Sequence, residues 1–451
     1  MFASPVQLDE TKVIALAIAA AAGCTDATST PVASNQQAVS ADGDSAEVPA
    51  SFLAGKRAIQ QRVAPRSSAG VVSSAAKNTA GGIDSLISFS GSFTTPGFDD
   101  AGNPQSVWPY TMVGRDPREG RTTRFNAPII PVTVELLDRS GNVGHTASGA
   151  PLRMVTGSDT VTSTLNSPVF QRSKTTAGNV QITDGMMRAQ FFGAVGDGDG
   201  DHDDQGYHTI LDPSVKPTRT VRLPFGTYRF APKADGTCCA FILADASTFA
   251  NTLFPATADD TTSVLGAAEH AGDIHTRDIT TLLLRDVYLF QGSPANCCIL
   301  GFHSVDVEPG DARNGNRERQ YVMNYSSYIS DGLFGSFSDI TAFSHEMSEL
   351  FADPFINNAT PWWLSIDPFT GAGLCQNNLE TGDVIEVLSV NPTATAALHN
   401  RTYHPSNEAL LSWFAFESPS SSHLGAYSFP DETTLTSLSP PNLLPGCVPA
   451  P

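Results

Sequence analysis

Basic residues are scarce in this sequence, and their scarcity excludes one large class of function. The 451 residues include 26 lysines and arginines against 46 aspartates and glutamates, which gives a formal net charge of −20 at pH 7 and a pI of about 4.7. Proteins that bind nucleic acid need a basic face for the phosphate backbone. We therefore expect no nucleic-acid partner, and we expect a soluble protein whose acidic surface attracts cations.

The apolar run near the N-terminus is too short to cross a membrane. Val13–Gly23 has 11 residues, whereas a helix that spans a bilayer needs about 20. The run suits the apolar part of a signal peptide, and Ala-Ala-Gly-Cys24 at its end resembles a bacterial lipoprotein cleavage site. We therefore expect an extracytoplasmic protein, secreted or attached to the membrane only through a lipid on Cys24. The alternative is an apolar start to a cytosolic protein.

The cysteines show no C-x-x-C spacing, which argues against a zinc site made of cysteines. There are seven, an odd number, and lipidation or removal of Cys24 would leave six for three disulfides in an oxidising compartment. The adjacent pairs Cys238-Cys239 and Cys297-Cys298 are candidates to bridge to each other, and Cys375 is a candidate to join Cys447. Spacing alone does not determine this connectivity.

One stretch, Phe337–Pro354, has the strongest pattern in the chain and predicts a short helix. Ser338 or Asp339 could cap its first turn, and Pro354 is typical of a helix end. Helical periodicity places an apolar stripe on one face, made of Ile340, Phe343, Met347, Leu350 and Phe351. The other face carries His345-Glu346-x-x-Glu349.

This polar face predicts a metal site. His345 and Glu349 are four residues apart, so they lie one turn above each other and can bind the same ion. Glu346 would then stand beside the ion as a general base. The pattern differs from the metallopeptidase motif H-E-x-x-H because Glu349 replaces the second histidine, but a carboxylate is also a zinc ligand. The alternative is an amphipathic surface helix with outward acidic residues and a chance histidine.

A catalytic zinc ion needs three protein ligands and an open position. Glu380 is the favoured third ligand, at the start of an expected strand, and Asp353 is the second candidate. Elsewhere, His303, Ser304 and Asp306 lie close together in the sequence. Sequence adjacency does not make them a catalytic triad, because the members must converge in space.

A short acidic loop predicts a weak calcium site. Its alternate positions resemble the first ligands of a calcium-binding loop: Asp197, Asp199, Asp201 and Asp203. Such a loop needs a glycine where His202 stands and a glutamate where His208 stands. We therefore favour a solvated acidic loop over a calcium site. Asp184, in an expected helix before this loop, is interpreted as a solvated or capping residue.

Composition and periodicity divide the chain into five regions and predict an α+β protein. A leader (1–24) precedes a flexible linker rich in Ala, Ser, Thr and Gly (25–84). A β-rich N-terminal domain (85–225), a zincin-like domain with the metal-motif helix (226–430) and a C-terminal tail (431–451) follow. Strands are expected at residues 86–93, 127–137, 220–230, 280–290, 297–303 and 320–325.

The motif helix, Asp353-Pro354, Cys375 and the segment Leu379-Glu-x-Gly-Asp383 together resemble a largely uncharacterised family of secreted bacterial proteins. More distantly, they resemble the plant phosphate-induced, EXORDIUM-like proteins. In the plant proteins a cysteine follows the acidic pair, whereas Cys375 precedes it here. The resemblance covers roughly residues 85–447. It implies an extracytoplasmic protein with a zincin-like metal helix, and the plant relatives are associated with growth control at the cell wall.

Two functions agree with these observations. The first is a zinc-dependent, peptidase-like hydrolase that acts on a peptide or a cell-surface polymer. The second is a non-catalytic cell-surface protein with a structural metal site, in which Trp362 and Trp363 bind a glycan or a protein partner. We favour the hydrolase.

Overall fold

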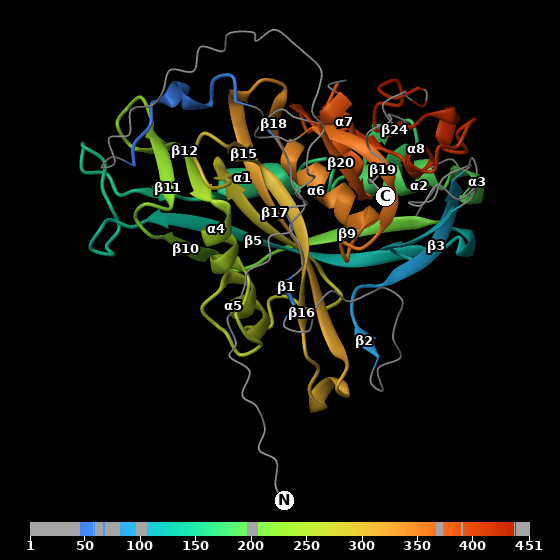
Figure 1. Ribbon diagram of the computed structural model, residues 1–451, viewed down its shortest axis with the longest axis horizontal. Helices are drawn as coiled ribbons and strands as arrows, with labels where there is room; N and C mark the ends of the chain where they lie inside the picture. Colours follow the sequence, from blue (N-terminus) through green and yellow to red (C-terminus); the bar gives the residue numbers. More distant parts are fainter. Residues whose placement is uncertain are drawn as a thin grey trace, which may run out of the picture. The chain divides into compact units, whose positions relative to one another are not determined.

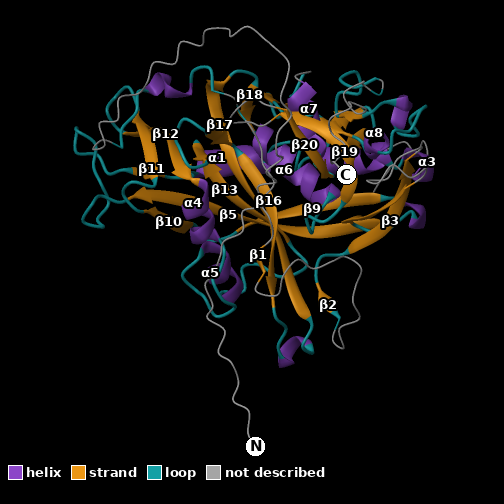
Figure 2. Ribbon diagram, viewed as in Figure 1, coloured by secondary structure: helices purple, strands orange, loops and turns teal. Residues whose placement is uncertain are grey.

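The computed structural model describes residues 46–56, 58, 66–67, 82–95, 106–195, 206–366, 373–388, 391–436 and 438. Strands account for 40% of the structure and helices for 21% (Figure 2), so the expected α+β class is confirmed. Among the described residues, no helix combines the length and the apolar character needed to span a bilayer. The leader with Cys24 and the calcium-loop candidates Asp197, Asp199, Asp201 and Asp203 lie outside the described residues.

The largest sheet has ten strands and includes β16, the strand that carries His303 (Figure 1). Its main path runs through β1 (Arg66–Ser67), β16 (Gly301–Glu308), β17 (Glu318–Phe334), β13 (Ile279–Arg285), β5 (Thr122–Leu136) and β10 (Arg219–Leu223). Pairing is parallel from β10 through β5 and β13 to β17, and antiparallel between β17 and β16. Also paired to this sheet are β2 (Ile83–Asp84), β6 (Arg153–Met154), β9 (His208–Val215) and β18 (Phe337–Asp339).

The sheet is covered on both faces, as parallel strands require. Side chains of β13 alternate between the two cores: Leu283 packs on one face, and Leu282 and Leu284 pack on the other. The first core is covered by α6 (Thr341–Ala352) and the second by α4 (Ala246–Leu253) and α5 (Val264–His270).

Smaller elements complete the fold. A four-stranded sheet contains β11 (Tyr228–Pro232), β12 (Cys238–Asp245), β14 (Val287–Phe290) and β15 (Cys297–Ile299). Two-stranded pairs are β3 (Ser88–Thr95) with β4 (Ser106–Val113), β7 (Ser173–Thr175) with β8 (Gly178–Val180), β19 (Ala359–Ile366) with β20 (Gly373–Asn378), β21 (Ala396–Leu398) with β22 (Arg401–Tyr403), and β23 (Glu408–Ala409) with β24 (Ser428–Phe429). The remaining α-helices of the described residues are α1 (Ser158–Leu165), α2 (Ile182–Gln190), α3 (Phe192–Val195), α7 (Thr381–Leu388) and α8 (Leu411–Phe414).

Two of the expected strands are broken. Residues 220–230 contain the end of β10 and the start of β11, and residues 280–290 contain β13 and β14. The second break lies at Asp286, whose φ of 51° is left-handed. Its carboxylate accepts a hydrogen bond from the Ser330 backbone N–H at 2.8 Å. Aspartate tolerates this conformation better than the surrounding Leu and Val residues would, so the chain leaves one sheet and enters another there.

Parts of the stretch expected to be a linker, residues 25–84, are packed into the fold. Leu53 is only 2% exposed, β1 pairs with β16, and β2 pairs with β17. The boundary expected at 225/226 also falls between strands of one sheet, because β5 pairs with β13. Ser45–Pro451 belong to a single compact unit.

The cysteines pair differently from the expectation. Cys238 is bonded to Cys239 and Cys297 to Cys298, so each adjacent pair closes on itself and the two pairs do not bridge to each other. Cys375 is also disulfide-bonded, and its candidate partner Cys447 lies outside the described residues.

Asp184 is fully buried, in contrast to the expectation that it is solvated. Its carboxylate lies 2.7 Å from Nδ1 of His208 and accepts the Thr209 backbone N–H at 2.7 Å. The contact joins α2 to β9, next to the face that α6 covers. Local pattern did not predict this pair because its two members lie 24 residues apart.

Asp184→Ala should destabilise the protein by about 3–5 kcal/mol, because it leaves His208 and a backbone N–H buried without their partner. Asp212→Ala is the matched control, since Asp212 lies on β9, as His208 does, and pairs with Arg124 at 3.0 Å but is half exposed. The control should cost about 0–1 kcal/mol. Urea unfolding measures both, and equal losses would contradict this assignment.

Candidate metal centre

The motif helix α6 begins later than expected. Ser338 and Asp339 belong to β18, which pairs with β17, and the helix starts at Thr341 without a side-chain cap. The expectation of a Ser338 or Asp339 cap is therefore wrong. The Asp339 carboxylate instead accepts the backbone N–H groups of Ile340 and His404. The helix ends at Ala352, just before Asp353-Pro354, as predicted.

Both faces of α6 are buried. The predicted apolar stripe lies in the core, and the exposed fraction is 0% for His345 and Glu346 and 2% for Glu349. The alternative of a surface helix with outward acidic residues is therefore wrong. Two acidic residues and a histidine on one buried face require partners from other elements.

Those partners come from three places in the chain. His303 lies on β16, Glu408 on β23, and Glu380, Asp383 and Glu386 lie at or within α7. Together with the three residues of α6 they form what we term the carboxylate–histidine cluster: His303, His345, Glu346, Glu349, Glu380, Asp383, Glu386 and Glu408. It contains two imidazoles and six carboxyl groups.

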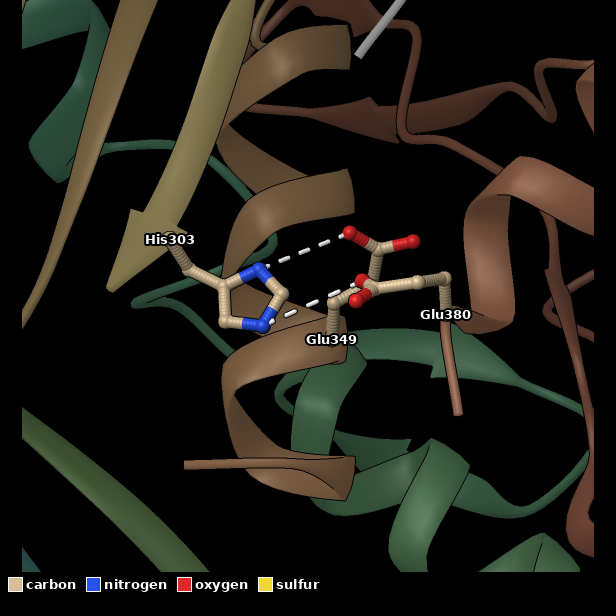
Figure 3. A group of neighbouring side chains, drawn as sticks. All are labelled: His303, Glu349 and Glu380. Carbon is tan, nitrogen blue, oxygen red and sulfur yellow. Dashed lines mark ion pairs between the residues drawn. The ribbon is translucent and has the colours of Figure 1, made fainter. Parts of the chain in front are cut away.

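The first group in the cluster is His303, Glu349 and Glu380, which point toward one another from a strand, a helix and the segment before α7 (Figure 3). Nδ1 of His303 is 3.6 Å from Oε2 of Glu349, and Nε2 is 3.9 Å from Oε2 of Glu380. One ligand atom from each residue lies within 4.8 Å of the others. Groups this close together could hold one cation between them.

The second group is His345, Glu349 and Glu408, whose ligand atoms also lie within 4.8 Å of one another. Nε2 of His345 is 3.1 Å from Oε1 of Glu349. Glu408 is held through Oε2 by the Thr381 hydroxyl at 2.8 Å. Glu349 therefore belongs to both groups.

The first turn of α7 positions Glu349. Its Oε1 accepts the backbone N–H groups of Gly382 at 3.0 Å and of Asp383 at 3.3 Å. These groups have no partner within their own helix, and the helix dipole favours a negative charge at this end. α6 and α7 are thus joined through the side chain of Glu349.

Two glycines allow this close packing. A Cβ at Gly301 would lie 2.7 Å from Cγ of Glu346, and a Cβ at Gly382 would overlap the imidazole of His345. Neither glycine has a positive φ, so each is needed for space and not for backbone conformation.

Burial dominates the electrostatics of the cluster. It raises the pKa of Glu346, Glu349 and Asp383, and it raises the pKa of Glu408 to about 7. Burial lowers the pKa of both histidines, but the surrounding carboxylates, led by Glu380 at His303 and Glu349 at His345, raise it by more. A bound metal ion would stabilise this group, because its positive charge favours ionised carboxylates and takes the place of the protons on the histidines.

The structure brings together His345, Glu346, Glu349 and Glu380, whereas Asp353 belongs to neither ligand group, although its negative charge helps to raise the pKa of His303. The Asp353 carboxylate accepts the backbone N–H groups of Asn357 and Asn358 at 2.8 and 3.1 Å and so closes the turn after α6. The expected strand after Glu380 is the helix α7. A short apolar run such as Val384-Ile385 does not distinguish a strand from a buried helix.

Sequence reasoning missed His303 and Glu408. Alternation along β16 could have found His303: Val305 points into the core beneath α6, while Phe302 points into the opposite core. His303 therefore shares a face with α6, and its sequence neighbours Ser304 and Asp306 point away from it. The same alternation excludes a triad of these three residues.

Trp363 is one of the two tryptophans expected to bind a glycan or a protein partner in the non-catalytic alternative, but the structure buries it. It is 1% exposed, packs against Trp413 and Phe414, and donates its indole N–H to the Asn378 carbonyl at 3.0 Å. It is a core residue and does not form a surface for a glycan or a protein partner.

A separate acidic cluster, outside the carboxylate–histidine cluster, lies on the opposite face of β16. Glu269 of α5 lies beside Asp306 and Glu308, and Arg319 contacts Glu308 at 2.9 Å. Burial, followed by the charges of Glu308 and Asp306, raises the pKa of Glu269 to about 9.

Gly382→Ala should destabilise the protein by about 1–3 kcal/mol through overpacking against His345. Alanine normally stabilises a helix relative to glycine by about 1 kcal/mol. Gly193→Ala in α3 is the control, because a Cβ there would meet nothing within 4 Å. Chemical denaturation should give opposite signs for the two substitutions, and stabilisation by both would contradict the packing described here.

Stability should fall as pH rises, through Glu269. The unfolded chain releases this proton near the ordinary pKa of 4.5, whereas the folded protein retains it up to about pH 9. The folded state therefore binds more protons between these values, and raising the pH favours unfolding. Thermal unfolding at several pH values should show a smaller decline for Glu269→Gln than for the wild type. Identical pH profiles would disprove the shift.

Comparisons with protein-family models, curated proteins and solved structures found no match for this chain. The assignment of function therefore depends on the geometry of the carboxylate–histidine cluster.

Proposed function

We propose that the protein is an extracytoplasmic, metal-dependent hydrolase of the peptidase type, with its ion held by His303, Glu349 and Glu380. The observation that supports it most is the convergence of these three side chains, from three separate elements, within 4.8 Å. Imidazole nitrogen and carboxylate oxygen are both zinc ligands, and three protein ligands leave a fourth position for water. The disulfides agree with an oxidising compartment.

The hydrogen bonding of His303 supports a metal at this position. Its Nδ1 lies 3.3 Å from Oε2 of Glu346 and 3.6 Å from Oε2 of Glu349, whereas its buried Nε2 has no hydrogen-bond partner among the described residues. Metal-binding histidines commonly direct their second nitrogen to a carboxylate, which fixes the ring. Nε2, which faces Glu380, is therefore the nitrogen available for the ion.

A zinc ion at this position would lower the pKa of a coordinated water and polarise a substrate carbonyl. In the proposed reaction Glu346, whose Oε2 lies 3.3 Å from Nδ1 of His303, would accept the proton of the attacking water. The substrate is a peptide or a cell-surface polymer. Two carboxylate ligands reduce the positive charge of the site, so we expect a weaker hydrolase than a site rich in histidine would give.

A structural metal site is the second candidate, and the burial of the cluster favours it. His303 is 1% exposed and Glu380 is 0% exposed. An ion there would hold α6 against β16 and the start of α7. Removing a structural ion should greatly lower the unfolding temperature, whereas removing a catalytic ion should lower it little.

The first test is the metal content of the exported protein, measured by mass spectrometry after zinc supplementation. The wild type should contain zinc, and His303→Gln should lose the ion held at this group. His423→Gln is the matched control, because His423 also pairs with a carboxylate, Glu432 at 2.6 Å, outside the cluster. A folded wild type without metal would refute the proposal.

Glu346→Gln then separates catalysis from metal binding. As the general base, Glu346 should contribute about 10²–10⁴-fold to kcat on a cleaved peptide, with zinc retained. If it acts only by orienting His303, metal affinity should fall by about 10–100-fold instead. Unchanged hydrolysis in the zinc-loaded variant would eliminate Glu346 as the base.

A further inference from the structure

We propose that the carboxylate–histidine cluster binds a second divalent metal ion, at His345, Glu349 and Glu408, and that the Glu349 carboxylate bridges the two ions. This inference depends on the proposed function, because the ion at His303, Glu349 and Glu380 is the first of the pair. It differs from the one-ion site expected from the motif, in which His345 and Glu380 share a single metal.

The orientation of Glu349 is the first argument. Its Oε2 lies 3.6 Å from Nδ1 of His303, and its Oε1 lies 3.1 Å from Nε2 of His345. One carboxylate thus directs its two oxygens to two different imidazoles, which come from β16 and α6. The backbone N–H groups of α7 hold this orientation. A carboxylate in such a position can bind one ion through each oxygen.

Glu408 provides an independent second argument. Thr381 occupies its Oε2, while Oε1 is buried and has no hydrogen-bond partner among the described residues. Glu408 is only 1% exposed, so bulk solvent does not donate a hydrogen bond to Oε1. A buried polar atom without a partner costs free energy, and Oε1 belongs to the group that converges on His345 and Glu349.

The surroundings of His345 also suit a ligand. Its Nδ1 lies 3.4 Å from the Ser406 hydroxyl and 3.7 Å from Oε1 of Glu386, which orient the ring. Its Nε2 faces Glu349 and lies 3.7 Å from Oδ1 of Asp383. One ring nitrogen is thus held by neighbouring groups, and the other points to carboxylates, as at His303.

Charge balance favours two ions over one. If both imidazoles are neutral and all six carboxyl groups ionise, the cluster carries a charge of −6, of which one divalent ion neutralises only a third. Buried charges without compensation are costly. A second divalent ion would leave −2. Imidazole and carboxylate ligands suit zinc and manganese, and paired ions in hydrolytic sites stabilise both the attacking and the leaving oxygen.

The experiment loads the purified full chain with Zn²⁺ or, separately, with Mn²⁺, and measures bound metal per chain by mass spectrometry. The wild type should bind two equivalents within the cluster. Mn²⁺ ions joined by a carboxylate should give a spin-coupled electron paramagnetic resonance spectrum, whereas a single ion gives an uncoupled one. This spectrum needs no catalytic activity and no substituted protein.

Glu408→Gln should reduce the metal content from two equivalents to one and abolish the spin coupling. Glu432→Gln is the matched control: one oxygen of Glu432 pairs with His423, the other has no hydrogen-bond partner among the described residues, and the residue is 8% exposed. The control should keep both ions. Circular dichroism confirms that each variant is folded, and the wild-type measurements stand if Glu408→Gln is not.

The outcomes separate the two proposals. Two coupled ions that depend on Glu408 support both. One ion that is lost in His303→Gln and retained in Glu408→Gln overturns the second site and leaves the proposed function. Two uncoupled ions overturn the bridge. No bound metal overturns the proposed function and this inference together.

Discussion

The Glu349 carboxylate is the contact on which the arrangement of the site depends. It lies on α6, faces the histidine of β16 through one oxygen and the histidine of its own helix through the other, and accepts two N–H groups from the start of α7. A helix, a strand of the main sheet and a second helix thus meet at one side chain. The positions of all three elements therefore depend on one buried carboxyl group, that of Glu349.

Burial of so many like charges is the main physical constraint on this region. Carboxylates removed from water raise each other's pKa or require cations, and the groups that lower the pKa values here are the two histidines. The apolar stripe of α6 and the core beneath it offset part of this cost by packing against the sheet. A bound metal would couple folding to function, because the same ion would hold α6, β16 and α7 together.

The carboxylate–histidine cluster lies on one face of the main sheet. Alternation along β16 places His303 toward α6 and places Asp306 and Glu308 toward α5. Adjacent residues of one strand therefore belong to different environments. The glycines at 301 and 382 leave room for the side chains of Glu346 and His345, because a Cβ at either position would overlap them. Sheet register and side-chain volume together define the space that the cluster occupies.

Local sequence pattern predicts the helix of the motif, its buried apolar stripe, its end just before Asp353-Pro354 and the common face of His345, Glu346 and Glu349. These features depend on neighbours three or four residues apart, which helical geometry brings together in any context. The α+β class is predicted by local periodicity in the same way. That His303, 43 residues before Glu346, and Glu408 join the site follows from long-range packing alone. Their positions depend on sheet register and on the packing of α7, which no local pattern contains. The helical state of α7, the pairing of adjacent cysteines and the role of Asp353 in a turn are also decided by the tertiary structure, because each depends on contacts that periodicity does not describe.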